Sequence, residues 1–326
     1  MKKIFKILAY IFCGITVLAI AFLIYFNSSY PKVDPPPNEN VEITPARIER
    51  GEYLAKHVAV CMDCHSTRDW SKFSGPPKIE TWGMGGDRFG EEIGFPGTLY
   101  AKNITPASIG NWSDGEIMRA ITCGVNKDGG AFFPLMPYLN YNKMTKEDLY
   151  SIVAYLRSIK PIENKVKEGS LNFPLNFIVK TIPPQSFHPS TEPDKNNSAK
   201  YGEYITNIAG CFDCHTQSVK GEYVMGKGFA GGAEFSFPGG VVRSANITPD
   251  KNTGISSWTK EQFIARFKVM DPDSNQIPNV NRNDYNTVMP WTMYAGMSRE
   301  DLGAIYDYLK TLKPIYNSVA KWTPHK

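Results

Sequence analysis

The sequence has 326 residues, of which 42% are hydrophobic, enough for two ordinary domains that each bury a core. The formal net charge is +4, and Lys2, Lys3 and Lys6 stand at the extreme N-terminus, so the rest of the chain is nearly neutral. This balance excludes an extended basic surface of the kind that binds nucleic acid, and no nucleic-acid partner is expected.

Residues 1–30 are predicted to form a transmembrane anchor. The stretch from Ile7 to Phe26 is an unbroken run of apolar and small residues, and a helix needs about 20 such residues to cross the hydrocarbon layer. The preceding lysines predict a cytoplasmic N-terminus. A cleaved signal peptide is the alternative, with Ala19 and Ala21 as its small residues, although the apolar run continues beyond them. We therefore expect a single-pass protein of the inner (cytoplasmic) membrane with its globular part in the periplasm.

After a proline-rich segment, residues 31–46, which is typical of a semi-rigid spacer, the chain contains an internal repeat. The repeat predicts two domains, residues 47–163 and 197–316, joined by the proline-rich connection 164–196 and followed by the tail 317–326. Residues 45–60 are expected to form a helix that leads into the first cysteine pair. The segments that recur in the same order are Gly51-Glu52-Tyr53 and Gly202-Glu203-Tyr204, Asn103-Ile104-Thr105-Pro106 and Asn246-Ile247-Thr248-Pro249, Met136-Pro137-Tyr138 and Met289-Pro290-Trp291, and Lys160-Pro161-Ile162 and Lys313-Pro314-Ile315.

Each half is predicted to end in an amphipathic helix. Thr145 and Ser298 are expected N-caps, with an aspartate three residues on in a variant of the capping box, and a proline follows each helix. The segments between the cysteine pairs and these helices are rich in Gly, Pro and Asn, with few alternating runs. The sequence therefore predicts an all-α fold in which long loops pack around a large apolar cofactor, with little or no sheet.

The pentapeptide Cys-x-x-Cys-His occurs once in each half and is the attachment signature of c-type haem. On a helix, two thiols three residues apart lie on one face, so both can bond the vinyl groups of one porphyrin. The histidine that follows becomes the proximal iron ligand. The sequence therefore predicts two covalently bound haem c groups. The first would be held by Cys61, Cys64 and His65, and the second by Cys211, Cys214 and His215.

Other interpretations of the cysteines explain less. A four-cysteine zinc site would require both pairs to converge from separate repeats. A thioredoxin-like redox pair is expected beside a strand-helix-strand pattern, which is not visible. A structural disulfide would leave the repeated histidine unexplained. Cys13 lies in the expected anchor, and Cys123 is expected to be a small buried hydrophobic residue.

Two methionine pairs keep the repeat offset and compete for the sixth coordination position of each iron. Met144 and Met297 directly precede the predicted N-caps, where an apolar residue packs on the following helix. Met136 and Met289 precede proline, which favours extended backbone and suits a loop that projects a side chain at the haem. Met136 and Met289 are therefore the expected axial ligands.

Other repeated residues have two interpretations. Asn103, Trp112, Asn246 and Trp258 could contact haem propionates or haem edges, or they could serve turn geometry and core packing. His57 lies one turn before Cys61 and is a weaker candidate ligand than the motif histidines. We expect no role for His188 or His325.

With these motifs in this order, the region from Arg50 to Ile315 resembles the cytochrome c subunits of membrane-bound bacterial alcohol and gluconate dehydrogenases. The resemblance implies class I cytochrome c-like domains with His/Met iron at the positions given above. It also implies a role in accepting electrons from a dehydrogenase and passing them to quinone, an oxidase or another cytochrome. Those subunits usually carry three haem domains, whereas this chain has two after its anchor.

The sequence therefore predicts an electron carrier that performs no chemistry on a substrate, either on its own or as a subunit of a dehydrogenase or oxidase complex. The alternative from another class is a dihaem peroxidase, which needs one haem with an open sixth position. Matching methionines in both halves argue against it. A haem-based gas sensor would require a signalling module, and the sequence contains none that we recognise.

Overall fold

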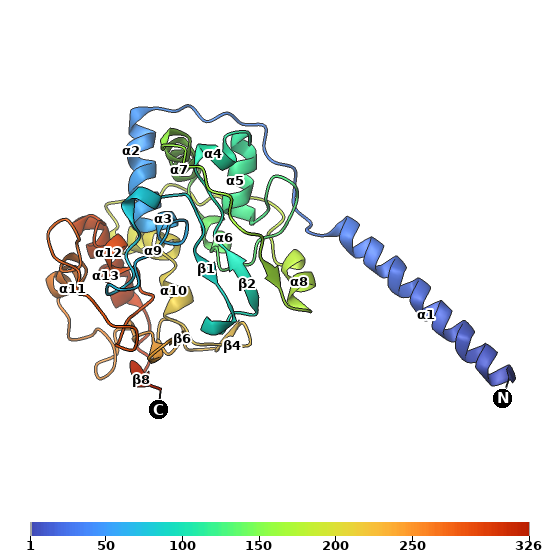
Figure 1. Cartoon of the computed structure of the whole chain (residues 1–326). Coiled ribbons are helices and arrows are strands. Elements are labelled where there is room, and N and C mark those ends of the chain that lie inside the picture. The colour runs from blue at the N-terminus through green and yellow to red at the C-terminus, as the bar shows by residue number, and fades with distance from the viewer. Residues whose placement is uncertain (1, 326) are drawn as a thin grey trace.

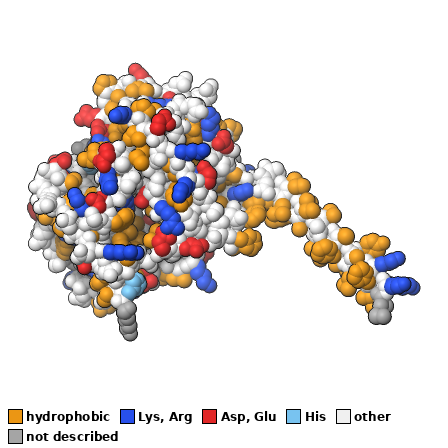
Figure 2. Space-filling model, viewed as in Figure 1, with side chains coloured by type: hydrophobic (Ala, Val, Ile, Leu, Met, Phe, Trp, Pro, Cys, Tyr) orange, Lys and Arg blue, Asp and Glu red, His pale blue; other side chains and the backbone are white. Residues whose placement is uncertain are grey.

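The computed structural model describes residues 2–325, and its most conspicuous element is a long N-terminal helix, α1 (Lys2–Ser29), that projects from the folded body (Figure 1). At 28 residues it is about 42 Å long, more than the roughly 30 Å of a hydrocarbon layer. Its side chains are exposed except for the half-buried Phe26 and Ser29 near the body, and Figure 2 shows apolar groups along its length with lysines at the free end. Within the described residues it is the one helix long and apolar enough to span a membrane.

The expected spacer contains no helix or strand between residues 30 and 44, yet it runs against the body. The Val41 amide donates to Asp114 Oδ2 over 2.8 Å, and the Asp34 amide donates to the Gln185 carbonyl over 2.8 Å. The Val41 side chain is buried. This segment therefore attaches to the folded body along its length.

Helices follow in the same order in the two halves of the repeat. The first half contains α2 (Pro45–Tyr53), the π-helix η1 (Leu54–Val58), α3 (Cys61–Cys64), the 3₁₀ turns η2 (Ile79–Thr81) and η3 (Glu91–Ile93), α4 (Pro106–Ile109), α5 (Asp114–Cys123), α6 (Tyr138–Tyr141) and α7 (Lys146–Ser158). The second half contains α9 (Ser198–Ile208), α10 (Cys211–Cys214), α11 (Lys260–Lys268), α12 (Trp291–Tyr294) and α13 (Arg299–Thr311). Between them lie α8 (Leu175–Ile178) and η4 (Val179–Thr181).

The first long helix of each half packs closely on the last helix of the same half, α2 on α7 and α9 on α13. Glycine makes the close approach possible. A Cβ at Gly51 would lie 1.8 Å from the Ser151 carbonyl oxygen, and one at Gly202 would lie 1.9 Å from that of Ala304. Both closing helices begin as predicted, because the side chains of Thr145 and Ser298 accept from the amide three residues on.

The expected all-α fold class is wrong, because the fold is a mixture of helices and short antiparallel strands. In residues 2–325 the strands form the sheets β1-β2-β3, β4-β5 and β6-β7-β8. Their bounds are β1 Arg88–Phe89, β2 Gly97–Tyr100, β3 Ser170–Leu171, β4 Ser218–Val219, β5 Glu222–Tyr223, β6 Glu234–Phe237, β7 Gly240–Arg243 and β8 Trp322–Pro324.

Two features hid these strands from the sequence. They are two to four residues long, shorter than the run over which alternation becomes visible. The outer strands also come from distant segments: Gly97 pairs with Leu171, and Gly240 pairs with Pro324. The expected connection and the expected tail therefore each add a strand to a sheet.

A one-residue difference between the halves is absorbed by the π-helix. The spacing from Tyr53 to Cys61 is one residue longer than that from Tyr204 to Cys211. The extra residue falls in η1, whereas α9 continues as a regular α-helix. Because a π-turn accommodates one added residue, Tyr53 and Cys61 keep the surroundings of their counterparts.

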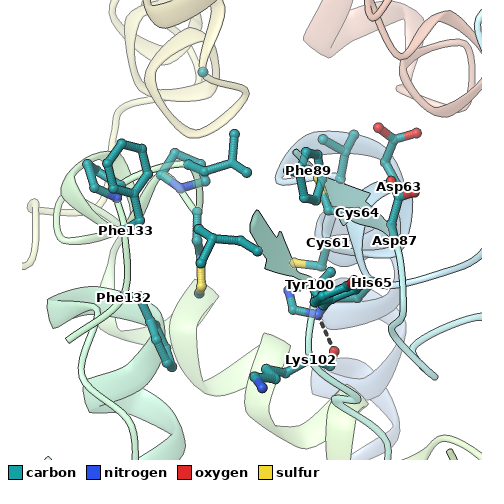
Figure 3. A pocket seen from close by; sticks show the side chains of 18 of the residues that line it. Cys61, Asp63, Cys64, His65, Asp87, Phe89, Tyr100, Lys102, Phe132 and Phe133 are labelled. Carbon is teal, nitrogen blue, oxygen red and sulfur yellow. Dashed lines mark hydrogen bonds between the residues drawn. The ribbon is translucent and has the colours of Figure 1, made fainter. Parts of the chain in front are cut away.

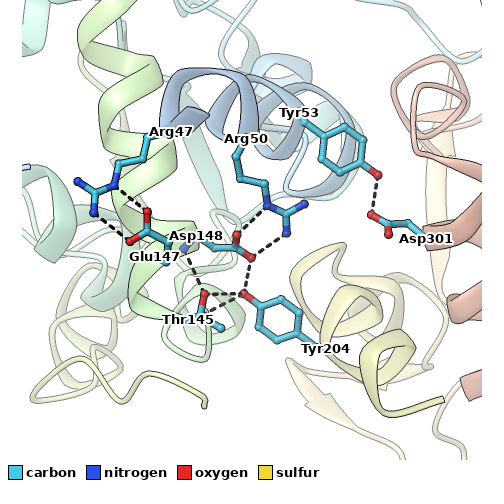
Figure 4. A network of polar contacts seen from close by, with 8 residues as sticks. All are labelled: Arg47, Arg50, Tyr53, Thr145, Glu147, Asp148, Tyr204 and Asp301. Atoms are coloured by element: carbon cyan, nitrogen blue, oxygen red, sulfur yellow. Dashed lines mark hydrogen bonds and ion pairs between the residues drawn. The ribbon is translucent and has the colours of Figure 1, made fainter. Parts of the chain in front are cut away.

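The two halves contact each other through reciprocal polar bonds (Figure 4). Tyr53 Oη donates to Asp301 Oδ2 over 2.6 Å and accepts from the Ser298 amide over 3.0 Å. The counterpart Tyr204 does the same with Asp148 Oδ2, over 2.6 Å, and the Thr145 amide, over 3.0 Å. Each tyrosine thus contacts the first turn of the other half's closing helix, which is the pattern of an isologous interface.

A second reciprocal pair lies nearer the cysteine motifs. His57 Nδ1 is 2.9 Å from the Met293 carbonyl oxygen, and Asn207 Nδ2 donates to the Asn140 carbonyl over 3.1 Å. His57 thus bonds the backbone of the other half, and its ring lies against Gly296.

Candidate functional site

Each cysteine motif is a single helical turn that begins after a residue with positive φ. Val60 precedes α3 at φ 46°, and Gly210 precedes α10 at φ 64°. This break turns the chain out of the preceding helix, so both cysteines of a motif lie on one short turn. Among the described residues, none of the cysteines forms a disulfide. The two thiols of each motif are therefore available to one ligand.

The histidine of each motif is held by one ring nitrogen. His65 Nδ1 is 2.6 Å from the Lys102 carbonyl oxygen, and His215 Nδ1 is 2.7 Å from that of Ala245 (Figure 3 for the first site). A carbonyl can only accept, so Nδ1 carries the proton and the lone pair is on Nε2. Burial lowers the pKa of both histidines, which favours the neutral ring. This is the state in which a histidine binds iron.

The Asn-Ile-Thr-Pro repeat fixes these two carbonyls. Asn103 Oδ1 accepts from the amide and the hydroxyl of Thr105, over 2.9 and 2.8 Å, and Asn103 Nδ2 donates to the Ile162 carbonyl over 2.8 Å. Asn246 repeats these bonds with Thr248 and Ile315. The asparagines therefore serve turn geometry, and the residue before each supplies the histidine's acceptor. Sequence reasoning missed Lys102 and Ala245, although their place beside a repeated motif was a usable signal.

A cavity of about 2090 Å³ opens beside the first motif. Ligand pockets are commonly about 300–1,000 Å³, so this space exceeds the need of one ordinary ligand. Its lining is mostly apolar and comes from both halves. Figure 3 shows Cys61, Cys64 and His65 on one side with Phe132 and Phe133 facing them. Such a space fits a large planar apolar group bonded at the cysteines.

All four predicted ligands of the first haem line the cavity, whereas the second set contributes one residue. Cys61, Cys64, His65 and Met136 all line it. Of the second set it reaches Cys214, whereas the other three residues, Cys211, His215 and Met289, lie outside its lining. Met289 is half-buried and packs against the core. The competing Met144 also lines this cavity, and both Met144 and Met297 belong to the core, at 0% and 1% exposed.

The charged groups around the two motifs differ. Asp63, inside the first motif, forms an ion pair with Arg68 at 3.1 Å, and both side chains are buried. Burial raises the pKa of nearby Asp87 to about 6. In the second motif, Asp213 accepts from Tyr223 Oη over 2.7 Å and from Asn140 Nδ2 over 2.5 Å. Sequence reasoning did not identify Arg68, although it lies three residues after His65, or Asp87, which lies farther along the chain.

The alternatives for the cysteines find little support here. No group of three or more His, Cys, Asp or Glu side chains in residues 2–325 could hold a metal ion, which disfavours a four-cysteine zinc site. Burial raises the pKa of the Cys61 and Cys64 thiols to about 12, the opposite of a thioredoxin-like nucleophile. Cys123 is buried beside Thr122, as expected for a packing residue.

Comparison with known proteins confirms the predicted resemblance. The chain is 27% identical over 296 residues to the alcohol dehydrogenase (quinone) cytochrome c subunit of Gluconacetobacter polyoxogenes, covering 85% of this chain and 58% of that protein. It is 30% identical over 236 residues to the fructose dehydrogenase cytochrome subunit of Gluconobacter japonicus, covering 68% and 44%. It is 26% identical over 265 residues to a diheme cytochrome c-type protein of Cereibacter sphaeroides, covering 78% and 82%.

The chain therefore spans about half the length of the dehydrogenase subunits that it matches, and most of the length of the diheme protein. No family model matches the sequence. The similarity to cytochrome c subunits supports electron transfer as the general role.

Proposed function

We propose that this protein is a membrane-anchored dihaem cytochrome c that carries electrons from a dehydrogenase to a respiratory acceptor. The observation that carries the proposal is the repeated Cys-x-x-Cys-His turn in which each histidine has its Nδ1 bonded to a backbone carbonyl and its Nε2 free for a metal. When bound, haem supplies an iron that gains and loses one electron.

In this proposal each half, residues 47–163 and 197–316, is a domain with one haem. The first is held by Cys61, Cys64, His65 and Met136, and the second by Cys211, Cys214, His215 and Met289. The cysteines would bond the group, and the Lys102 and Ala245 carbonyls orient the histidines that would bind its iron. Met136 and Met289 would supply the sixth ligands, and methionine at that position raises the reduction potential and hinders the binding of small molecules.

The surroundings of the first motif suit a carrier. The mostly apolar lining would keep water from the faces of a bound haem, so that little solvent would reorganise when the charge changes by one. The shared lining is consistent with electron exchange between the two groups within one molecule. A peroxidase would instead need one haem whose sixth coordination position is open to peroxide.

Helix α1 is proposed as a single-pass anchor in the inner membrane, with the body in the periplasm. Lys2, Lys3 and Lys6 favour a cytoplasmic N-terminus. Several relatives are named as cytochrome subunits of alcohol, fructose and gluconate dehydrogenases. The electron donor is therefore proposed to be a dehydrogenase of this kind, and the acceptor an oxidase, quinone or another cytochrome.

The test uses membranes that contain the full chain and matched membranes from a deletion strain. We expect ethanol, gluconate or fructose to reduce the haem only where the chain is present, and a dehydrogenase to co-purify from solubilised membranes. A resting high-spin haem with peroxide turnover, and no co-purifying dehydrogenase, would instead identify a peroxidase.

A further inference from the structure

The loop after the first cysteine motif does not stay in its own half. Residues 71–74 lie against residues 278–280 of the second half: the Phe73 amide donates to the Pro278 carbonyl over 2.8 Å, and the Val280 amide donates to the Ser71 carbonyl over 2.9 Å. The hairpin that follows the second motif, β4-β5, is exposed on both strands. The two loops therefore have different surroundings although the motifs before them match.

Ser74 is the last residue of this loop segment and contacts the backbone at Met289. Its hydroxyl donates to the Met289 carbonyl over 2.5 Å and accepts from the Trp291 amide over 3.0 Å. The Ser74 side chain is 1% exposed. One buried hydroxyl from the first half thus bonds the backbone on both sides of Pro290 in the second.

The contact continues through two more buried side chains. The Ser74 amide donates to Asn286 Oδ1 over 2.8 Å, and the same oxygen accepts from the Thr287 amide over 2.8 Å. Thr287 Oγ1 then accepts from the Met289 amide over 3.1 Å. Both the amide and the carbonyl of Met289 are therefore tied into one network that starts at Ser74.

The backbone of Ser74 is unusual, because its φ is +69°. A non-glycine residue in this region costs about 1 kcal/mol or more and persists where surrounding contacts determine it. Glycine would adopt this conformation without strain but would lack the hydroxyl. Serine at this position combines the strained backbone with a hydroxyl that makes two hydrogen bonds to the other half.

The first half has no equivalent arrangement. The Met136 carbonyl accepts from the Tyr138 amide, as the Met289 carbonyl accepts from the Trp291 amide. Among the described residues, no side chain of the second half donates to the Met136 carbonyl. The support from the other half is specific to Met289.

We propose that Ser74 is a positioning residue for the second haem: through the Met289 backbone, the first half holds in place the methionine that would bind the iron of the second half. This inference rests on the proposed role of Met289 as an iron ligand. It predicts that methionine ligation of the second haem depends on Ser74, which lies in the loop that follows the attachment motif of the first haem.

The test compares full-length S74A, S74G and M289L in detergent, with S71A as the matched control, because the Ser71 hydroxyl lies on the same loop and, among residues 2–325, bonds only Asp69. The readouts are the long-wavelength sulfur-to-iron band of the ferric protein, the two midpoint potentials, and binding of imidazole. M289L should lose about half of the band, since one of two methionine-ligated haems is affected.

We expect S74A and S74G to lose part of the sulfur-to-iron band, at most the half that M289L loses. One midpoint potential should fall while the other stays unchanged, and imidazole should bind at one haem per molecule. S71A should match the unaltered protein. S74G keeps the test valid if S74A folds poorly, because glycine relieves the backbone strain. A normal band and normal potentials in both Ser74 variants, with loss in M289L, would overturn the inference alone. An unchanged band in M289L would overturn both the inference and the ligand assignment beneath it.

Discussion

The two halves share the order of their repeated motifs and of their main helices, yet they surround their cysteine motifs differently. Beside the first motif, Asp63 and Arg68 form a buried ion pair, and the following loop is hydrogen-bonded to the second half. The second motif is open: Cys214 is exposed, and the following hairpin faces solvent.

The features that both halves share are those the site requires, whereas the loops between them differ. Both retain the glycine at the helix crossing, the tyrosine bonded to the opposite N-cap, and the carbonyl that accepts from the motif histidine. The difference in length before the motif is absorbed by the π-turn. The loop after the motif differs most, and in the first half it supports the other half instead.

The largest expected effect comes from the helix crossings. G51A and G202A should each destabilise the protein by about 3 kcal/mol or more, because the added Cβ meets a backbone carbonyl that cannot move independently. Thermal unfolding of the full-length protein in detergent measures this. The control is G303A on α13, where the Cβ would meet the flexible Lys260 side chain at 3.4 Å. Unequal losses in G51A and G202A would break the equivalence of the halves.

A smaller effect is expected at the reciprocal tyrosines. Y53F and Y204F should each cost about 2 kcal/mol, because each leaves a buried carboxylate oxygen and an N-cap amide without the phenol. The exposed Tyr316 provides the control Y316F, which should leave the unfolding temperature unchanged. If either interface variant were as stable as Y316F, the interface would not depend on these bonds.

The smallest effect concerns His57, which has no titratable counterpart in the second half. Burial lowers its pKa, and the neighbouring Lys56 and Lys268 act in the same direction against Glu52. The unfolded chain then binds more protons than the folded one, so stability is lost as the pH falls below about 6.5. H57N, which copies the type of its counterpart Asn207, should lose less stability than the unaltered protein between about pH 7 and pH 5. Equal losses in both would show that His57 does not contribute.

The parts of the fold that local patterns determine could be predicted from the sequence. The apolar run predicted α1, and the Thr145 and Ser298 caps predicted the closing helices. The repeat predicted that matching helices occur in both halves, because repeated sequence segments make the same local contacts. The ligand assignments remain predictions, with Cys61, Cys64, His65 and Met136 brought to one cavity.

The rest depends on contacts between distant residues. The sheets were missed because strands of two to four residues carry no readable period and pair with segments far along the chain. The interface was missed because Tyr53 and Asp301 show no pattern that relates them. Ser74 was missed for the same reason: its hydroxyl donates to the Met289 carbonyl and accepts from the Trp291 amide, and both residues are far from it in sequence.

The most direct test of the account is the mass of the purified mature protein and of its cysteine-containing peptides. We predict an intact mass that exceeds the polypeptide by two haem groups, with one haem on the peptide containing Cys61 and Cys64 and one on the peptide containing Cys211 and Cys214. A colourless protein, or peptides from either half without the added mass after normal export and maturation, would contradict the central claim.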